Sequence, residues 1–144
     1  MDINLSTNNF KIEGKVGSNH TSLIMKLPEY GHFTTKTLPL TQSILRKHLP
    51  SIFECQCFNE KGKCFHEESK NTELGHLFEH IMLEFLCIEK LDKGQNEATY
   101  EGRTDWEIDR QNVFYIEIKI GIKDTKIIKK AFNKSVNLFK KILN

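Results

Sequence analysis

Strand-like patterns of apolar residues occur in four stretches of the chain. Residues 10–16 alternate between apolar and charged side chains, and residues 23–27 follow after turn-forming residues at 18–20. These two stretches predict a β-hairpin. Two more strands are predicted in the second half of the chain. One places Thr104, Trp106 and Ile108 on one face, and the other places Phe114, Ile116, Ile118 and Ile120 on one face.

Three other stretches have the spacing of apolar residues that is typical of helices. A short helix is predicted to begin with Thr41 as its N-cap and to end near Pro50. A long helix is predicted over about residues 71–91. An amphipathic helix is predicted over 124–144, with Asp124 as its N-cap. The resulting order β-β-α-α-β-β-α predicts an α+β fold, with helices packed on a mainly antiparallel sheet.

Length and composition indicate one globular domain over residues 1–144. A hydrophobic share of 38% and a charged share of 28% are those of an ordinary folded protein. The chain has no basic-then-apolar start of the secretory kind, and no apolar run approaches the roughly 20 residues of a membrane span. We therefore expect a cytoplasmic protein with no membrane contact, whose four cysteines are thiols or metal ligands rather than disulfides.

The predicted helix over 71–91 contains His76, Glu79 and His80 in the pattern H-x-x-E-H, the reversed form of the zinc-hydrolase signature. Two histidines four residues apart lie on one face of a helix and can bind one metal ion, for which zinc is well suited. Glu79 would then act as general base and afterwards as general acid. The alternative is a helix with two solvated histidines and no metal.

A zinc ion on this helix requires a third protein ligand, and the preceding residues offer several. The pattern C-x-C-x6-C-x-H is formed there by Cys55, Cys57, Cys64 and His66. These four residues could instead bind a structural zinc ion of their own. Glu84 is a further candidate, either as a ligand or as a partner that orients a histidine. The residues by themselves leave the third ligand open.

Basic residues offer two other candidates for binding. Residues 124–144 hold six lysines, although the net charge of the chain is only +2. We expect these lysines to be solvated; the alternative, attraction of an anionic polymer or of nucleic acid, is not favoured. Arg103 could hold a substrate carboxylate through a bidentate contact. It could equally form a structural ion pair with Glu101 or Asp105.

Six short motifs follow one another in order between residues 23 and 120. They are Leu-Pro at 49–50, Cys-x-Cys at 55–57, a Gly-to-Phe stretch at 62–65, T-x-x-G-H-x-x-E-H-x-x-L-E at 72–84, Gly-Arg-Thr at 102–104 and a strand at 112–117. Together they resemble the N-terminal domain of cyanophycin synthetase, the enzyme that polymerises aspartate and arginine. The ordered series is much more specific than H-x-x-E-H alone.

This resemblance implies binding of the polymer and, as in some members of the family, its metal-dependent hydrolysis. It favours Cys57 as the third ligand, because Cys57 falls at the family's cysteine position. The chain departs from the family in the segment proposed to complete the metal site. Cys55 replaces a usual histidine, Lys63 and Cys64 replace paired glycines, and Glu73 replaces an aromatic residue.

We therefore expect a zinc-dependent hydrolase of an amide or peptide bond, in an aspartate/arginine-type polymer or an isopeptide. His76, His80 and Cys57 would bind the zinc, with Glu79 as acid–base and Arg103 as substrate contact. Two alternatives stay open: a non-catalytic module that binds a peptide or polymer, and an interaction domain whose zinc only supports folding. The sequence does not determine the oligomeric state, and a homo-oligomer is compatible with it.

Overall fold

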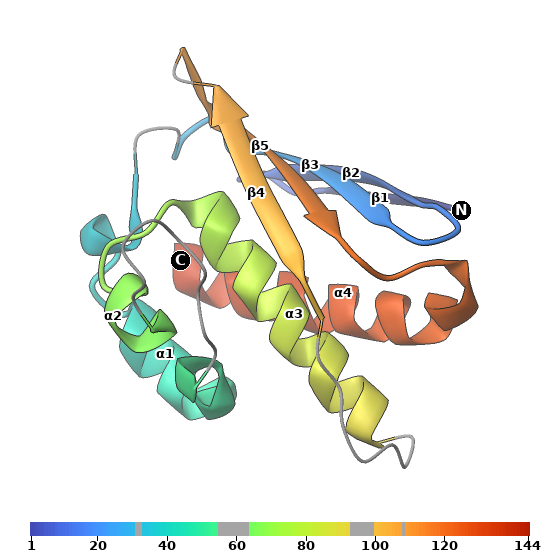
Figure 1. Cartoon of the computed structure of the whole chain (residues 1–144). Helices are drawn as coiled ribbons and strands as arrows, with labels where there is room; N and C mark the ends of the chain where they lie inside the picture. Colours follow the sequence, from blue (N-terminus) through green and yellow to red (C-terminus); the bar gives the residue numbers. More distant parts are fainter. Residues whose placement is uncertain (31–32, 55–63, 93–99, 108) are drawn as a thin grey trace.

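The computed structural model of the protein describes residues 1–30, 33–54, 64–92, 100–107 and 109–144. Its strands, helices and short 3-10 helices (η) are arranged as Figure 1 shows. In chain order they are β1 (Asp2–Ser6), β2 (Lys11–Val16), β3 (Thr21–Lys26), η1 (Thr35–Thr37), α1 (Thr41–His48), η2 (Pro50–Glu54), α2 (Phe65–Glu68), α3 (Leu74–Asp92), β4 (Gly102–Glu107), β5 (Arg110–Ile118), η3 (Ile122–Asp124) and α4 (Thr125–Leu143).

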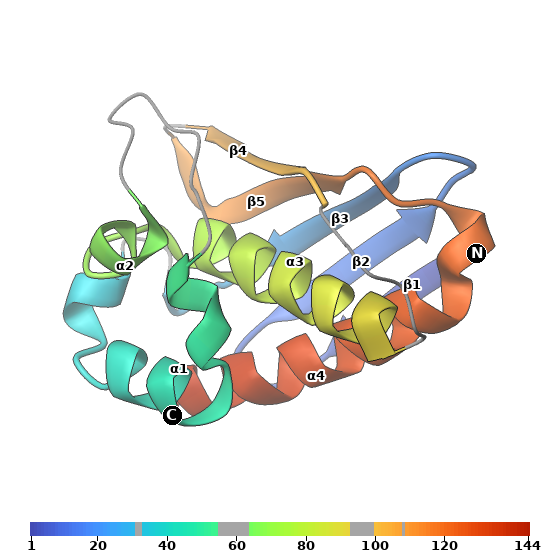
Figure 2. The ribbon, with the colours of Figure 1, turned by 60° about the horizontal axis from the view of Figure 1, so that its bottom comes forward.

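The strands form one antiparallel sheet in the order β1-β2-β3-β5-β4, so that β1 and β4 are its edges. The two long helices α3 and α4 lie side by side on one face of this sheet (Figure 2). The α+β fold with a mainly antiparallel sheet is therefore confirmed. In the described part of the chain, no helix is long and apolar enough to cross a membrane.

Besides the short 3-10 helices, one strand and one α-helix were not predicted from the sequence. The first is β1, which pairs with β2 and points Ile3 into the core and Leu5 to the same side. Its five residues alternate as a strand should, but the pattern is too short to stand out from a polar terminus. The second is α2, a single turn whose Phe65 is fully buried. Ile108, which was predicted to share one strand face with Thr104 and Trp106, lies outside the described residues.

One of the two predicted N-caps is wrong, and the other is confirmed in position. Thr41 is the first residue of α1 and Leu40 occupies the N-cap position, while the Thr41 hydroxyl donates to the Leu38 carbonyl. Asp124 does occupy the N-cap position of α4, but its side chain makes no capping hydrogen bond. It pairs instead with Lys90 of α3 at 3.0 Å, because the packing of α3 beside α4 supplies a cation to it.

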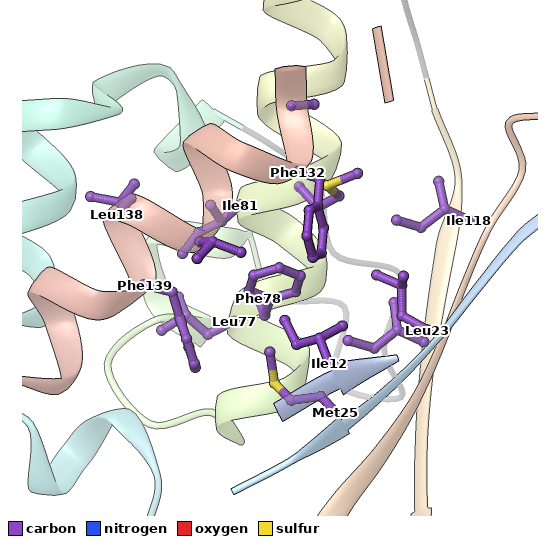
Figure 3. Packing of buried hydrophobic residues seen from close by; sticks show 14 of the residues in the cluster. Ile12, Leu23, Met25, Leu77, Phe78, Ile81, Ile118, Phe132, Leu138 and Phe139 are labelled. Carbon is purple, nitrogen blue, oxygen red and sulfur yellow. The ribbon is translucent and has the colours of Figure 1, made fainter. Parts of the chain in front are cut away.

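The core lies between the sheet and the two long helices. Figure 3 shows side chains of the sheet pointing toward those of α3 and α4. At its centre, the rings of Phe78 and Phe139 meet edge to face, with centroids 5.4 Å apart. The predicted inward face of β5 and its extension is buried, and α3 is buried on most of its sides, as expected. The labelled core residues are Ile12, Leu23, Met25, Leu77, Phe78, Ile81, Ile118, Phe132, Leu138 and Phe139.

The first turn of α3 reaches the sheet because it carries a glycine. A Cβ atom on Gly75 would overlap the Phe114 side chain of β5, which is itself buried. The contact involves the Cβ and the near end of the ring, so a small rotation of Phe114 cannot relieve it. Gly75 therefore sets how closely α3, and the histidine that follows it, approaches β4 and β5.

We predict that Gly75→Ala destabilises the protein despite the higher helix propensity of alanine. Overpacking of a buried contact costs about 1–3 kcal/mol, which outweighs the helix gain of about 1 kcal/mol at most. Urea unfolding of both proteins measures the difference. In a Phe114→Ala background, where most of the overlapping atoms are gone, the same change should cost less. An unchanged or higher free energy of unfolding for Gly75→Ala would contradict this account.

Candidate metal centre

The spacing of three residues on α3 brings their metal-binding atoms together. His76, Glu79 and His80 each offer one ligand atom, and these atoms all lie within 4.8 Å of one another. The two imidazole Nε2 atoms are 3.1 Å apart, and the rings are nearly perpendicular. Among the residues that the structure describes, no other trio of histidine, cysteine and acidic side chains gathers in this way.

A threonine just before the helix orients the first histidine. The Thr72 hydroxyl lies 2.7 Å from Nδ1 of His76. Thr72 is itself fixed to Thr35, whose backbone N–H donates to the Thr72 carbonyl and whose hydroxyl accepts from the Thr72 N–H, both at 2.9 Å. With Nδ1 engaged in this way, Nε2 is the atom that faces His80. Such outer partners are common around metal-bound histidines, where they fix the ring and its tautomer.

The second histidine is buried against an aromatic ring. His80 stacks on Phe65 of α2, with centroids 4.2 Å apart and planes 20° apart. Burial, with a smaller contribution from the neighbouring His76, lowers the pKa of His80 to about 3. Burial also lowers the pKa of His76, against a weaker opposing effect of Glu68 and Glu73. Both imidazoles are therefore neutral at pH 7, which is the form that binds metal, and the donor set fits zinc.

The carboxylate of the trio is held by β4. The Thr104 hydroxyl donates to Oε1 of Glu79 at 2.6 Å. Glu79 is only 4% exposed, and this burial raises the pKa of its carboxyl to about 7. The Thr104 hydrogen bond lowers the pKa, and the charge of Asp105 raises it, each by less than the burial does. A carboxyl with this pKa can accept and return a proton near neutral pH.

A glycine of β4 faces the other carboxylate oxygen. An added Cβ on Gly102 would lie 3.1 Å from Oε2 of Glu79, closer than nine in ten real Cβ contacts. Gly102 therefore leaves room beside this oxygen. Sequence reasoning did not select Gly102 or Thr104 as site residues. The only signal for them was the Gly-Arg-Thr motif at 102–104.

The predicted third ligands are not brought to this trio within the described residues. Cys57, the favoured ligand, and Cys55 lie outside those residues. Cys64 is described and exposed, and it is not part of the trio. Glu84 accepts a hydrogen bond from the Ser51 hydroxyl at 2.6 Å and is not part of it either. The third ligand-type atom near the two imidazoles is an oxygen of Glu79.

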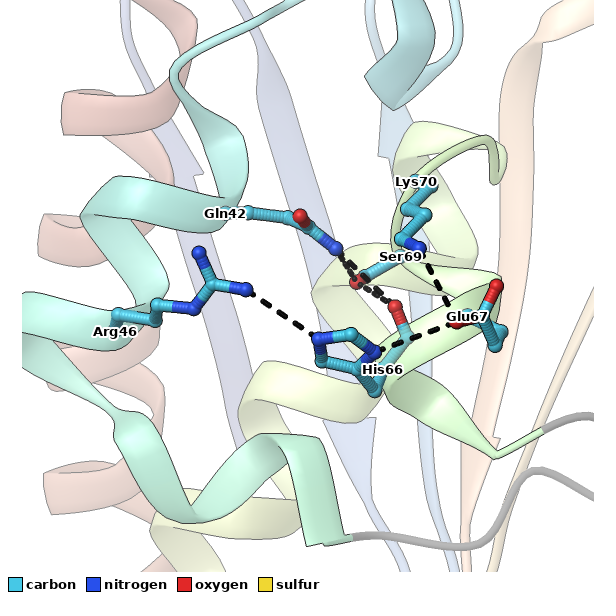
Figure 4. Close-up of polar contacts among 6 residues, drawn as sticks. All are labelled: Gln42, Arg46, His66, Glu67, Ser69 and Lys70. Carbon is cyan, nitrogen blue, oxygen red and sulfur yellow. Dashed lines mark hydrogen bonds and ion pairs between the residues drawn. The ribbon is translucent and has the colours of Figure 1, made fainter.

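His66 belongs to a separate polar network between α1 and α2 (Figure 4). Arg46 donates to Nε2 of His66 at 3.3 Å, and Nδ1 lies 3.5 Å from Glu67. Gln42 donates to the His66 carbonyl and to the Ser69 hydroxyl, both at 3.1 Å. These contacts link α2, which carries Phe65, to α1. The network thus helps to hold Phe65 in the position where His80 stacks on its ring.

Arg103 points away from the trio. In a strand, successive side chains lie on opposite faces, so the contact of Thr104 with Glu79 turns Arg103 to the other face of the sheet. There its Nε atom lies 2.8 Å from Asp105, and the side chain is 74% exposed. The pair with Asp105 is one of the two structural ion pairs that the sequence offered for Arg103. Its role as a substrate contact stays a prediction.

Comparison with known proteins identifies a family. The sequence model of the family described as "Cyanophycin synthase-like N-terminal domain" matches residues 22–144, most of the chain. The search of curated proteins found no match. The matched region contains the whole H-x-x-E-H trio, its partners Thr72 and Thr104, and the helix α4.

We predict a pH-dependent gain of stability from Glu79→Gln in protein kept free of metal by a chelator. The pKa of Glu79 is about 7 in the folded protein and about 4.5 when unperturbed, so the folded state holds the proton more tightly. The contribution of Glu79 to the free energy of unfolding is therefore fully present below pH 4.5 and is lost as pH rises through 7. Glutamine escapes that loss, so the variant should be more stable at pH 8 by about 1–3 kcal/mol.

Urea unfolding of wild type and variant at several pH values between 4 and 8.5 measures this gain. The histidines are common to both proteins, so their pH dependence cancels in the difference. Glu29→Gln, at an exposed position, is the matched control and should show no such trend. A difference between Glu79→Gln and wild type that does not grow from pH 4.5 to 7 would show that the carboxyl is not buried in solution.

Proposed function

The chain belongs to the family of cyanophycin synthase-like N-terminal domains, and we propose that it is a metal-dependent hydrolase of amide bonds. One observation carries this proposal. Two neutral, largely buried imidazoles converge next to a buried carboxyl with a pKa of about 7. Burial of three titratable groups in one place is costly for folding, and such groups cluster at functional sites.

The proposed metal is zinc, held by Nε2 of His76 and Nε2 of His80. Cys57 is the proposed third ligand, on the ground of its place in the family pattern. Catalytic zinc sites use three protein ligands, imidazole and thiolate among them, and keep the fourth position open. When bound, the metal would activate a water molecule and polarise the carbonyl group of the substrate.

Glu79 would carry the protons of the reaction. The Thr104 hydrogen bond holds Oε1, so Oε2 is the oxygen that takes the proton of the attacking water. The water oxygen bonds to the amide carbon, and Glu79 returns the proton to the nitrogen as the C–N bond breaks. The products are a free amine and a carboxylic acid, which then releases its proton to solvent as it ionises. Thr104 acts as a positioning residue, because it fixes the carboxyl without taking part in the transfer.

The proposed substrate class is a peptide or an amino-acid polymer of the aspartate/arginine type, including an isopeptide bond. This rests on the family, whose N-terminal domain we linked to such a polymer from the sequence. Exposed charges of both signs, the pair of Arg103 and Asp105 among them, lie on the strand that holds Glu79. They suit a substrate that itself carries both signs.

A second candidate function is non-catalytic binding of an acidic or mixed-charge polymer. The observation in its favour is the outer face of α4, on which six lysines are exposed. One of them, Lys134, pairs with Glu89 of α3. On this view the lysines are the contact surface, and Glu79 has no role in function. The six are Lys126, Lys129, Lys130, Lys134, Lys140 and Lys141.

We predict near-stoichiometric zinc in protein purified from a zinc-replete host. Because both imidazoles supply Nε2 to one site, His76→Ala and His80→Ala should each remove the metal. Inductively coupled plasma mass spectrometry measures the content. His48→Ala, at an exposed position of α1, is the control and should retain the metal. Full zinc content in both site variants would place the metal among the cysteines before α2 instead.

We predict that Glu79→Gln separates catalysis from metal binding. Glutamine can still accept the hydrogen bond of Thr104, so zinc content and folding should be retained. It cannot take a proton from water, so hydrolysis should fall by about 10²–10⁴-fold. Cyanophycin, isoaspartyl peptides and ordinary peptides serve as substrates, and released amines are measured. Glu29→Gln is the control.

Three results would each change the proposal in a distinct way. Zinc-loaded wild type that binds the polymer and cleaves nothing would favour the binding module. Wild-type turnover by Glu79→Gln would refute the proton-transfer role even with the metal in place. Loss of zinc from Glu79→Gln would make Glu79 a metal ligand rather than the acid–base.

A further inference from the structure

The strand that holds the catalytic carboxyl is an edge of the sheet. β4 pairs with β5 on one side, and no described segment of the chain pairs with its other side. Edge strands present unpaired backbone groups to which another extended chain can add. Whether this edge can serve the site depends on which residues of β4 direct those groups outward.

The backbone hydrogen bonds between β4 and β5 show which residues of β4 bond to β5 and which direct their backbone groups outward. Lys119 N–H donates to the carbonyl of Glu101 at 2.9 Å. Gly102 is opposite Ile118, so continuing the register by one step places Glu101 opposite Lys119. In an antiparallel ladder, bonded pairs alternate with non-bonded pairs. Arg103 and Asp105 are therefore the next residues to bond to β5. The N–H and C=O groups of Gly102 and Thr104 point to the open edge.

The neighbouring pair of strands supports this assignment. Leu27 N–H donates to the carbonyl of Asn112 at 2.8 Å, so β5 uses its even-numbered residues to bond toward β3. Its odd-numbered residues are left to bond β4, as the pair of Glu101 and Lys119 requires. The two edges of β5 are thus used alternately. Gly102 and Thr104 are left with outward backbone groups.

The same two residues are the ones that contact Glu79. The Thr104 side chain donates to Oε1, and Gly102 is the position where a side chain would crowd Oε2. An extended chain bonded to Gly102 and Thr104 would therefore run beside the carboxyl and the two histidines. Gly102 is exposed, which leaves its backbone accessible.

We propose that the open edge of β4 at Gly102–Thr104 binds the substrate as an added β-strand. The substrate class that follows is an extended polypeptide main chain, recognised by its backbone N–H and C=O groups and not by one particular side chain. This inference rests on the proposed hydrolase function and adds how the amide bond is presented. Gly102 is then a specificity-determining position, because any side chain there would fill the space beside Oε2.

Two features of β4 limit the length of this pairing. The register shifts between Asp105 and Glu107, and such an irregularity interrupts regular pairing. The charged residues Arg103 and Asp105 are typical of an edge that avoids adding a second copy of the chain. The regular part is therefore short, from Gly102 to Thr104. A few residues of one extended peptide suit it better than a long intermolecular sheet.

The ligand experiment uses zinc-loaded protein and hydroxamate probes, because a hydroxamate group chelates zinc. Acetohydroxamate reports on the metal centre alone. A capped tetrapeptide hydroxamate of alanine and serine adds a main chain, and should bind more tightly. Two isomers of the tetrapeptide hydroxamate form a matched pair: one is N-methylated at one residue, and the other at the next residue. They differ because successive N–H groups of a strand point to opposite sides. One isomer should bind about three- to tenfold more weakly than the other, the usual effect of one hydrogen bond.

The protein experiment compares Gly102→Pro with Gly102→Ala. Both add a Cβ beside Glu79, but only proline removes the outward N–H, and that N–H makes no bond to β5. Relative to Gly102→Ala, Gly102→Pro should bind the tetrapeptide hydroxamate about three- to tenfold more weakly and acetohydroxamate equally. Hydrogen exchange on wild type gives an independent readout. The probe should slow the amides of Gly102 and Thr104, and leave that of Arg103 unchanged.

Equal affinity of the two isomers, together with unchanged exchange at Gly102 and Thr104, would overturn the edge proposal. If acetohydroxamate still binds in that case, the proposed metal centre is retained. Absence of zinc-dependent acetohydroxamate binding would overturn both the metal centre and the edge proposal, because the edge proposal rests on that centre. Protection of the same two amides that rises with protein concentration, without any probe, would show that a second copy of the chain occupies the edge. That result too would overturn the proposal.

Discussion

The close packing of α3 against both the sheet and the neighbouring helix α4 is the constraint on which the rest of the structure depends. The helix is held by apolar side chains on most of its sides, and Gly75 lets its first turn reach Phe114 of β5. As a result, Glu79 and His80 cannot turn their polar atoms toward water. Every polar contact around the trio follows from this burial, because an unpaired buried polar group is costly.

The partners found for these side chains also set their chemistry. Thr72 engages His76, Thr104 engages Glu79, and Phe65 stacks on His80. Burial is the largest cause of the pKa shift of each of the three groups. The imidazoles stay neutral, and the carboxyl titrates near pH 7. The same burial that weakens the fold at this place makes the three groups suited to bind a metal and transfer a proton, a trade-off typical of functional sites.

Strand β4 links the fold to the proposed chemistry. Its inner face holds Glu79 through Thr104, its outer face carries the ion pair of Arg103 and Asp105, and its open edge directs the backbone of Gly102 and Thr104 outward. One short strand thus positions the carboxyl and offers a path for an extended chain next to it. The position of β4 at the edge of the sheet is what makes both roles available together.

The sequence by itself determined the features that depend on local periodicity. The spacing of His76, Glu79 and His80 already placed them on one helix face, and the apolar pattern located α3, β5 and α4. Only the tertiary structure decided what meets that face. Thr104 lies 25 residues from Glu79 along the chain, and their contact depends on the register of β4 and the approach of α3. The ion pair that Asp124 forms with Lys90 in place of a capping hydrogen bond has the same origin, as does the direction of Arg103 away from the trio. Periodicity fixes the direction of a side chain relative to its own element, whereas packing between elements fixes which side chain lies opposite.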